Sequence, residues 1–124
     1  MNISFKNKLI LITGSTQGIG FETGKALLNL GANVIFNSRT NNLKQLKKVK
    51  QSQLKHIVAD VSDYYKAKKL LKTIKKDYGL LNHIVCNVGN GSSVNIQKGS
   101  FAEINDMMQK NLFSSTNIIS QAPE

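Results

Sequence analysis

A glycine-rich stretch near the N-terminus, Thr13 to Gly20, has the sequence TGSTQGIG. It follows the aliphatic run LILI and precedes a segment in which apolar residues recur at helical spacing. Glycines at such a point let the backbone turn tightly and approach a phosphate group. The helix that follows offers free N–H groups and the positive end of its dipole. The stretch therefore predicts a cradle for a diphosphate, and the competing interpretation is a tight strand-to-helix turn.

A serine and an arginine, Ser38 and Arg39, stand at the end of the next apolar run. This is about twenty residues after the glycines, where a ribose-reading side chain is expected in a dinucleotide site. Enzymes that select NAD place an acidic side chain there, and that charge would repel a 2′-phosphate. A hydroxyl and a cation can instead hold a 2′-phosphate, so NADP is expected and NAD is the less favoured cofactor. The alternative is that Arg39 simply occupies a surface turn.

Strand and helix patterns alternate along the chain. Strands are expected at 8–13, 32–38, 54–59 and 81–88. Helices are expected at 19–30, 41–50, 62–79 and 100–119. Parallel strands joined through helices need right-handed crossovers, so an α/β fold is predicted, with a doubly wound parallel sheet in a single domain over 1–124.

Apolar spacing also predicts which side of each helix faces the sheet. For the first helix the inward residues are Ile19, Thr23, Ala26, Leu27 and Leu30, and for the second they are Leu43, Leu46 and Val49. For the third they are Ala67, Leu70, Leu71, Ile74 and Tyr78. The last helix begins with Ser100-x-x-Glu103, the form of a capping box.

Four segments of the chain together resemble the short-chain dehydrogenase/reductase family. TGSTQGIG is similar to the family's cofactor loop, T-G-x-x-x-G-x-G, and Ala59-Asp60-Val61 resembles its acidic position after the third strand. CNVG at 86–89 resembles its N-N-A-G motif, with Cys and Val in place of the first Asn and the Ala. Lys110-Asn111-Leu112 resembles the segment that carries its helical Asn. The resemblance spans the whole chain and implies a Rossmann-type fold and hydride transfer between NADP(H) and a carbonyl or alcohol substrate.

The resemblance assigns the expected site residues one by one. Those expected to bind the cofactor are Gly14, Ser15, Thr16, Gly18, Ile19, Gly20, Ser38, Arg39, Asp60, Val61, Asn87, Val88 and Gly89. Within this set, Asp60 is expected to contact the adenine amino group, and Asn87 to fix the geometry of the loop and the strand.

Asn111 is the expected catalytic residue. Its spacing from Ile104 and Met108 puts a polar amide on or beside the buried stripe of the last helix, where it needs hydrogen-bond partners. In the family this Asn bends its helix and holds a water of the proton relay.

The rest of the family's catalytic set, a Ser and a Tyr-x-x-x-Lys pair, follows a fifth strand. This chain is therefore expected to be a cofactor-binding N-terminal portion, truncated after about four strands and four helices, and inactive alone. Its fourth strand would be an open edge and its last helix would expose an apolar stripe. Tyr64 with Lys68 and Tyr65 with Lys69 match the spacing, but they follow the adenine side of the fold and are expected to be surface residues.

Composition narrows the partners. Sixteen of the seventeen basic residues are lysines and the formal charge is +10, which favours solvated helix faces over specific nucleic-acid binding. The chain has no membrane-length apolar run, and its one cysteine, Cys86, fits a cytoplasmic protein. His56 and His83 lack metal-ligand spacing with Cys86, so no metal is expected. The sequence does not give the oligomeric state, although full-length members of the family that it resembles are commonly homo-oligomers.

Two alternatives to the oxidoreductase stay open: a non-catalytic dinucleotide-binding or interaction module, and a lysine-rich polyanion binder. The substrate is also open. The loop NVGNGSSVN resembles family members that modify surface polysaccharides or nucleotide sugars, and reduction of a fatty-acyl ketone is equally compatible.

Overall fold

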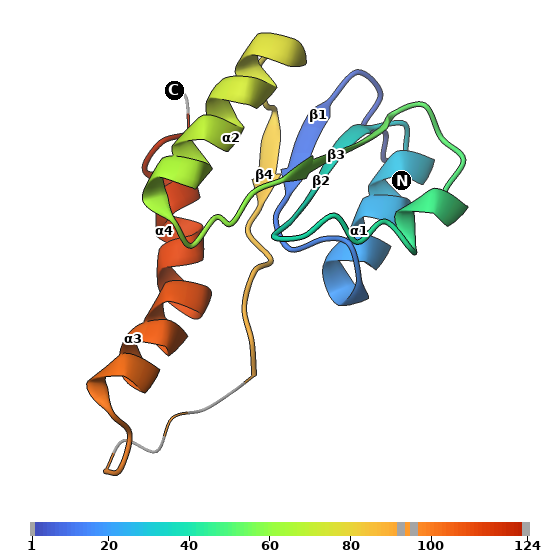
Figure 1. The fold of residues 1–124 in the computed structure, drawn as a ribbon. Coiled ribbons are helices and arrows are strands. Elements are labelled where there is room, and N and C mark those ends of the chain that lie inside the picture. The colour runs from blue at the N-terminus through green and yellow to red at the C-terminus, as the bar shows by residue number, and fades with distance from the viewer. Residues whose placement is uncertain (1, 92–93, 95–96, 123–124) are drawn as a thin grey trace.

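Four parallel strands form a single sheet through the centre of the molecule (Figure 1). The computed structural model describes residues 2–91, 94 and 97–122, so part of the loop NVGNGSSVN lies outside the described residues. The strands are β1 (Leu9–Ile12), β2 (Asn33–Ser38), β3 (Leu54–Val58) and β4 (His83–Val85). Their order in the sheet is β3-β2-β1-β4, so β1 lies between β2 and β4. All four predicted strands are confirmed, although β4 is shorter than expected.

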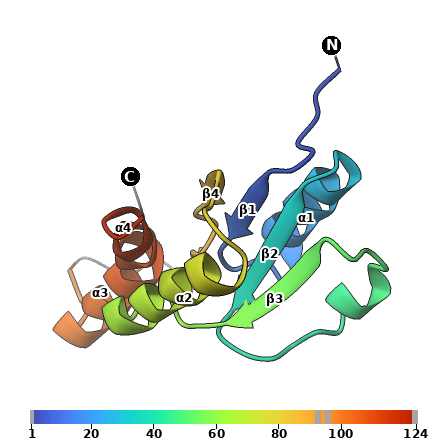
Figure 2. The same cartoon turned by 90° about the horizontal axis from the view of Figure 1, so that it is seen from above.

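Helices cover both faces of the sheet, as predicted (Figure 2). They are α1 (Gly18–Asn29), the 3₁₀ turn η1 (Leu46–Lys48), α2 (Tyr64–Asp77), α3 (Phe101–Met108), the π-helical segment η2 (Gln109–Phe113) and α4 (Ser114–Ile119). On one face α1 and η1 pack on β1 and β2 around Phe36. On the other face α2 and α4 pack on the same strands around Leu11, Ile35 and Ile74.

The inward side of α1 differs from the prediction. Ile19, Ala26 and Leu30 are exposed, whereas Phe21 and Leu28 are buried together with Gly20 and Gly24. A Cβ at Gly24 would lie 2.2 Å from Cζ of Phe36. The helix therefore meets the sheet along its glycines, and glycine contributes nothing to an apolar periodicity.

Two further expectations are wrong in part. The helix expected over 41–50 is only the short turn η1, in which Leu46 is buried while Leu43 and Val49 are partly buried against the core. Tyr78, expected to face inward from α2, is exposed because α2 ends at Asp77 and Gly79 turns the chain away with φ +98°.

The last helical region runs through three segments in place of one regular helix. Its capping box is confirmed: the Ser100 hydroxyl accepts from the backbone N–H of Glu103, and the Glu103 carboxylate accepts from the backbone N–H of Ser100. The backbone N–H of Ser100 and then its hydroxyl, which both donate to this carboxylate, hold the pKa of Glu103 below its usual value. Ile118 is fully buried, but Phe101 is 84% exposed and Leu112 and Ile119 are also exposed, so an apolar stripe faces outward as expected.

Substituting Gly24 tests the close contact between α1 and β2. In an open helix Gly→Ala is favourable by about 1 kcal/mol. Here we expect Gly24→Ala to lower the free energy of unfolding by about 1–3 kcal/mol, because the added methyl group overlaps the Phe36 ring. Denaturant unfolding measures this change. In a Phe36→Leu background the same substitution should cost less, and an equal cost in both backgrounds would contradict the proposed contact.

Candidate cofactor site

The glycine-rich loop leaves β1 and enters α1 through two left-handed positions. Gly14 has φ +60° and Gly18 has φ +61°, a conformation that other residues rarely adopt. Between them, Ser15 is fully buried: its hydroxyl donates to Ile12 O (2.6 Å) and accepts from the backbone N–H of Asn37 (3.0 Å). Ser15 was expected to bind cofactor, but the structure uses its side chain to join the loop to β1 and β2.

Asn87, just after β4, locks this loop from the other side. Its side-chain amide donates to Gly14 O (2.9 Å), and its backbone N–H donates to the hydroxyl of Thr13 (3.1 Å). A Cβ at Gly20 would lie 2.5 Å from Nδ2 of Asn87, so the helix, the loop and the strand end meet without spare room. The expected structural role of Asn87 is confirmed.

The N-terminus of α1 lacks the side-chain cap that the other two main helices have. Asp63 caps α2 and Ser100 caps α3, but Gln17 makes no capping bond to α1. The first turn of α1 also carries no acidic residue. Free N–H groups at a helix start suit an anionic group such as a diphosphate. A Cβ at Gly18 would meet no atom within 4 Å, so the space beside these N–H groups is open.

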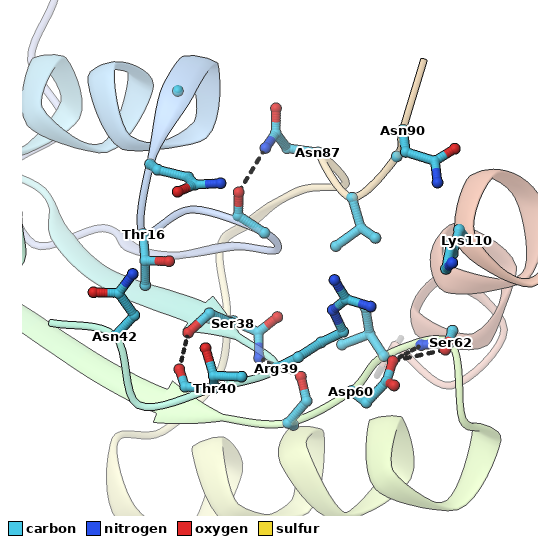
Figure 3. Close-up of a pocket in the computed structure, with 18 of the residues that line it drawn as sticks. Thr16, Ser38, Arg39, Thr40, Asn42, Asp60, Ser62, Asn87, Asn90 and Lys110 are labelled. Carbon is cyan, nitrogen blue, oxygen red and sulfur yellow. Dashed lines mark hydrogen bonds between the residues drawn. The ribbon is translucent and has the colours of Figure 1, made fainter. Parts of the chain in front are cut away.

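The loop borders a cleft of about 700 Å³ at the carboxyl ends of the strands (Figure 3). Eleven expected residues line it: Gly14, Thr16, Gly18, Ile19, Ser38, Arg39, Asp60, Val61, Asn87, Val88 and Gly89. Three expected residues, Ser15, Gly20 and Asn111, do not line the cleft but contact residues that do. The cleft lining also includes residues that the motifs do not mark: Gln17, Asn37, Thr40, Asn42, Ala59, Ser62, Asn90 and Lys110.

Asp60 lines the cleft at the start of the turn that follows β3. Its Oδ1 accepts from both the backbone N–H (3.0 Å) and the hydroxyl (2.6 Å) of Ser62. The following segment is held by Asn117 of α4, whose amide donates to Val61 O (3.1 Å) and Ser62 O (2.9 Å). Sequence reasoning missed Asn117, and its only signal is a polar residue beside the buried Ile118.

Ser38 and Arg39, at the end of β2, also line the cleft. The two ion pairs within the described residues join Lys25 to Glu22 and Lys110 to Asp106, so Arg39 has no carboxylate partner there. In Figure 3 its guanidinium group points into the cleft. The hydroxyl of Ser38 donates to Thr40 O at 2.6 Å.

The stripe on or beside which Asn111 is expected is not buried here: Asn111 and Ile104 are exposed, and α3 and η2 contain no buried residue. The expectation that the Asn111 amide has hydrogen-bond partners is confirmed. Its Oδ1 accepts from the backbone N–H of Asn90 (2.9 Å) and its Nδ2 donates to Met107 O (3.0 Å). Asn111 thus links the irregular helix to the loop after β4, on the side of the cleft where Lys110 stands.

Tyr64 and Tyr65 are confirmed as surface residues. They stack edge to face with ring centroids 5.4 Å apart, are both exposed and do not line the cleft.

The described part of the chain contains no group of three or more His, Cys, Asp or Glu side chains placed to hold a metal ion. Burial raises the pKa of the Cys86 thiol, while a hydrogen bond with Ser115 opposes that shift. Within the described residues, every helix is too short or too polar to cross a bilayer.

Comparison with known proteins decides the family. The family profile described as short chain dehydrogenase matches residues 8–123. The chain belongs to this family. A relative from Dictyostelium discoideum, a dehydrogenase/reductase SDR family protein 7-like protein, is 32% identical over 92% of this chain and 40% of its own length. The NADP-dependent mannitol dehydrogenase of Alternaria alternata is 25% identical over 92% of this chain and 46% of its own.

Solved structures of family members agree with the fold. The aldohexose dehydrogenase of Thermoplasma acidophilum superposes with a TM-score of 0.82 at 25% identity, over 95% of this chain and 44% of its own. The short-chain dehydrogenase fold and a Rossmann-type parallel sheet are therefore shown. The chain spans about half the length, or less, of these relatives.

Asn117 provides a test of how α4 supports the cleft. We expect Asn117→Asp, which keeps the shape but points a carboxylate at two carbonyl oxygens, to lower the free energy of unfolding by about 1–3 kcal/mol. Thermal or denaturant unfolding at neutral pH measures the change. The matched control is Asn105→Asp at an exposed position of α3. Equal losses in the two variants would show that Asn117 does not clamp the turn.

Proposed function

We propose that this chain binds NADP(H) and forms the cofactor-binding half of an oxidoreductase that moves hydride between NADP(H) and a small carbonyl or alcohol substrate. The observation that carries the proposal is the uncapped start of α1, which opens beside Gly18 into the cleft lined by Arg39 and Asp60. Family membership supports the activity, and the name of the mannitol dehydrogenase supports NADP.

In this proposal, three regions of the cleft bind the diphosphate, the 2′-phosphate and the adenine of the cofactor. Backbone N–H groups from Thr16 to Ile19 bind the diphosphate, because these positions combine free donors with the positive end of the α1 dipole. Ser38 and Arg39 bind the 2′-phosphate. Asp60 and Val61 border the adenine, where an Asp60 oxygen accepts from the exocyclic amino group.

A bound cofactor would give hydride to the substrate, or accept it, through its nicotinamide ring. Near the loop after β4, Val88 and Gly89 border the cleft, and Asn111 braces that loop through Asn90. We assign Asn111 to the catalytic set because its irregular helix lies beside this end of the cleft. The general acid that protonates or deprotonates the substrate oxygen belongs, in this proposal, to the remaining half of the protein.

Gly18→Val tests the diphosphate cradle. The side chain would project into the space beside the α1 N-terminus, so we expect affinity for NADPH to fall by about 10- to 100-fold, which corresponds to a clash of about 1–3 kcal/mol. Titration calorimetry or nicotinamide fluorescence measures the affinity. Gly79→Val is the matched control: Gly79 also has a positive φ and open space around its Cβ position, but it lies at the end of α2. Unchanged affinity in Gly18→Val would refute the cradle.

Arg39→Gln tests the choice of cofactor. Loss of charge-assisted hydrogen bonds to the 2′-phosphate should weaken NADPH binding by about tenfold or more and leave NADH binding nearly unchanged. The dissociation constants of both cofactors measure the effect at fixed ionic strength. Lys72→Gln, on the exposed side of α2, removes the same net charge. If Lys72→Gln weakens NADPH binding equally, general attraction to a basic protein explains the affinity and the NADP assignment is wrong.

A further inference from the structure

The imidazole of His56 lies directly beside Ser38, the residue assigned to the 2′-phosphate. In the register of the sheet His56 of β3 is opposite Phe36 of β2, and Ser38 follows two residues after Phe36. His56 and Ser38 therefore point to the same face of the sheet. Nε2 of His56 lies 2.8 Å from Oγ of Ser38, which also lies 2.6 Å from Thr40 O.

A count of protons fixes the direction of these two hydrogen bonds. A carbonyl oxygen only accepts, so the single proton of the Ser38 hydroxyl goes to Thr40 O. The contact with His56 then needs its proton from the ring, so Nε2 of His56 carries a hydrogen and donates to Ser38. Burial lowers the pKa of His56, which favours the neutral ring in this arrangement.

This arrangement leaves Ser38 able to accept one more hydrogen bond but unable to donate one. A ribose hydroxyl can donate to it, whereas a 2′-phosphate has only acceptors to offer at neutral pH. Ser38 can serve a phosphate only if its hydroxyl proton turns away from Thr40. Thr40 is exposed, so its carbonyl oxygen can then accept from water.

We propose that His56 is a positioning residue for cofactor choice: its Nε2–H holds the Ser38 oxygen in place while the Ser38 hydroxyl turns from Thr40 to the 2′-phosphate. This rests on the proposed NADP(H) function. The chain of donors then runs in one direction, from His56 to Ser38 to phosphate, and each donor strengthens the next. Arg39 contributes charge from an exposed side chain, whereas His56 acts from within the sheet.

Two amide variants separate this role from simple packing. The amide nitrogen of Gln can take the place of Nε2, while that of Asn falls short of it. Probes are adenosine 2′,5′-bisphosphate and 5′-AMP, which differ only in the 2′-phosphate, titrated into the ¹⁵N-labelled chain and followed by NMR. We expect His56→Asn to weaken binding of the bisphosphate about 3- to 10-fold and of 5′-AMP by less than about twofold. His56→Gln should retain most of the affinity for the bisphosphate.

A double-mutant cycle shows whether His56 acts through Ser38. In a Ser38→Ala background, His56→Asn should have no further effect on the ratio of the two affinities. An equal loss for both probes, a loss that persists in the Ser38→Ala background, or failure of His56→Gln to recover binding would overturn the inference. His56→Phe replaces His56→Asn if the latter does not fold.

If the unmodified chain binds neither probe, the proposed function itself fails. If it binds both and His56→Asn leaves their ratio unchanged, only the role of His56 is refuted.

Discussion

The hydrogen bond from the Asn87 amide to Gly14 O is the interaction on which the rest of the site depends. It joins the end of β4 to the loop that leaves β1, and those two strands are neighbours in the sheet. The amide fits only because Gly20 has no side chain. Ser15 completes the arrangement by tying the same loop to β2. With the loop fixed to three strands, the start of α1 keeps a constant direction toward the cleft, and its free N–H groups point where an anion would lie.

The charge distribution in the cleft depends on which charged side chains already have an ion-pair partner. Asp60 is the one acidic residue in the lining, and both of its Oδ1 bonds come from Ser62. Lys110 is paired with Asp106, whereas Arg39 has no carboxylate partner among the described residues. Arg39 therefore contributes a positive charge without an ion-pair partner among the described residues, in addition to the positive end of α1. This distribution differs from the general basicity of the chain, most of which lies on lysines of exposed helix faces, and it favours a ligand with phosphates at two separate points.

Sequence patterns predicted the strands, a parallel sheet covered on both faces and eleven of the cleft-lining residues, because strand patterns and the glycine loop are local properties of the chain. The sequence patterns gave wrong or incomplete results where something other than apolar side chains determines the packing or the contacts of a residue. The side of α1 that packs on the sheet includes Gly20 and Gly24, and glycines are not counted in an analysis of apolar periodicity. The stripe expected beside Asn111 is not buried, since α3 and η2 contain no buried residue. Asn117 and His56 are separated from their partners by 55 and 18 residues, and nothing local to either residue reveals such a pairing.

Most of the polar side chains in the family motifs direct their hydrogen bonds to the protein. Ser15 and Asn87 bind backbone atoms of the loop and strands, Asp60 binds Ser62, and Asn111 binds the loop after β4. The groups left for a ligand include backbone N–H groups of the loop, the Arg39 guanidinium and the second oxygen of Asp60. The motif therefore specifies the shape of a loop more than a set of ligand contacts. Since a diphosphate is recognised largely through backbone N–H groups, that shape is itself the recognition element. In the function proposed above, selectivity between NADP and NAD depends on residues outside the glycine-rich motif, namely Ser38 and Arg39 at the end of β2 and His56 within β3.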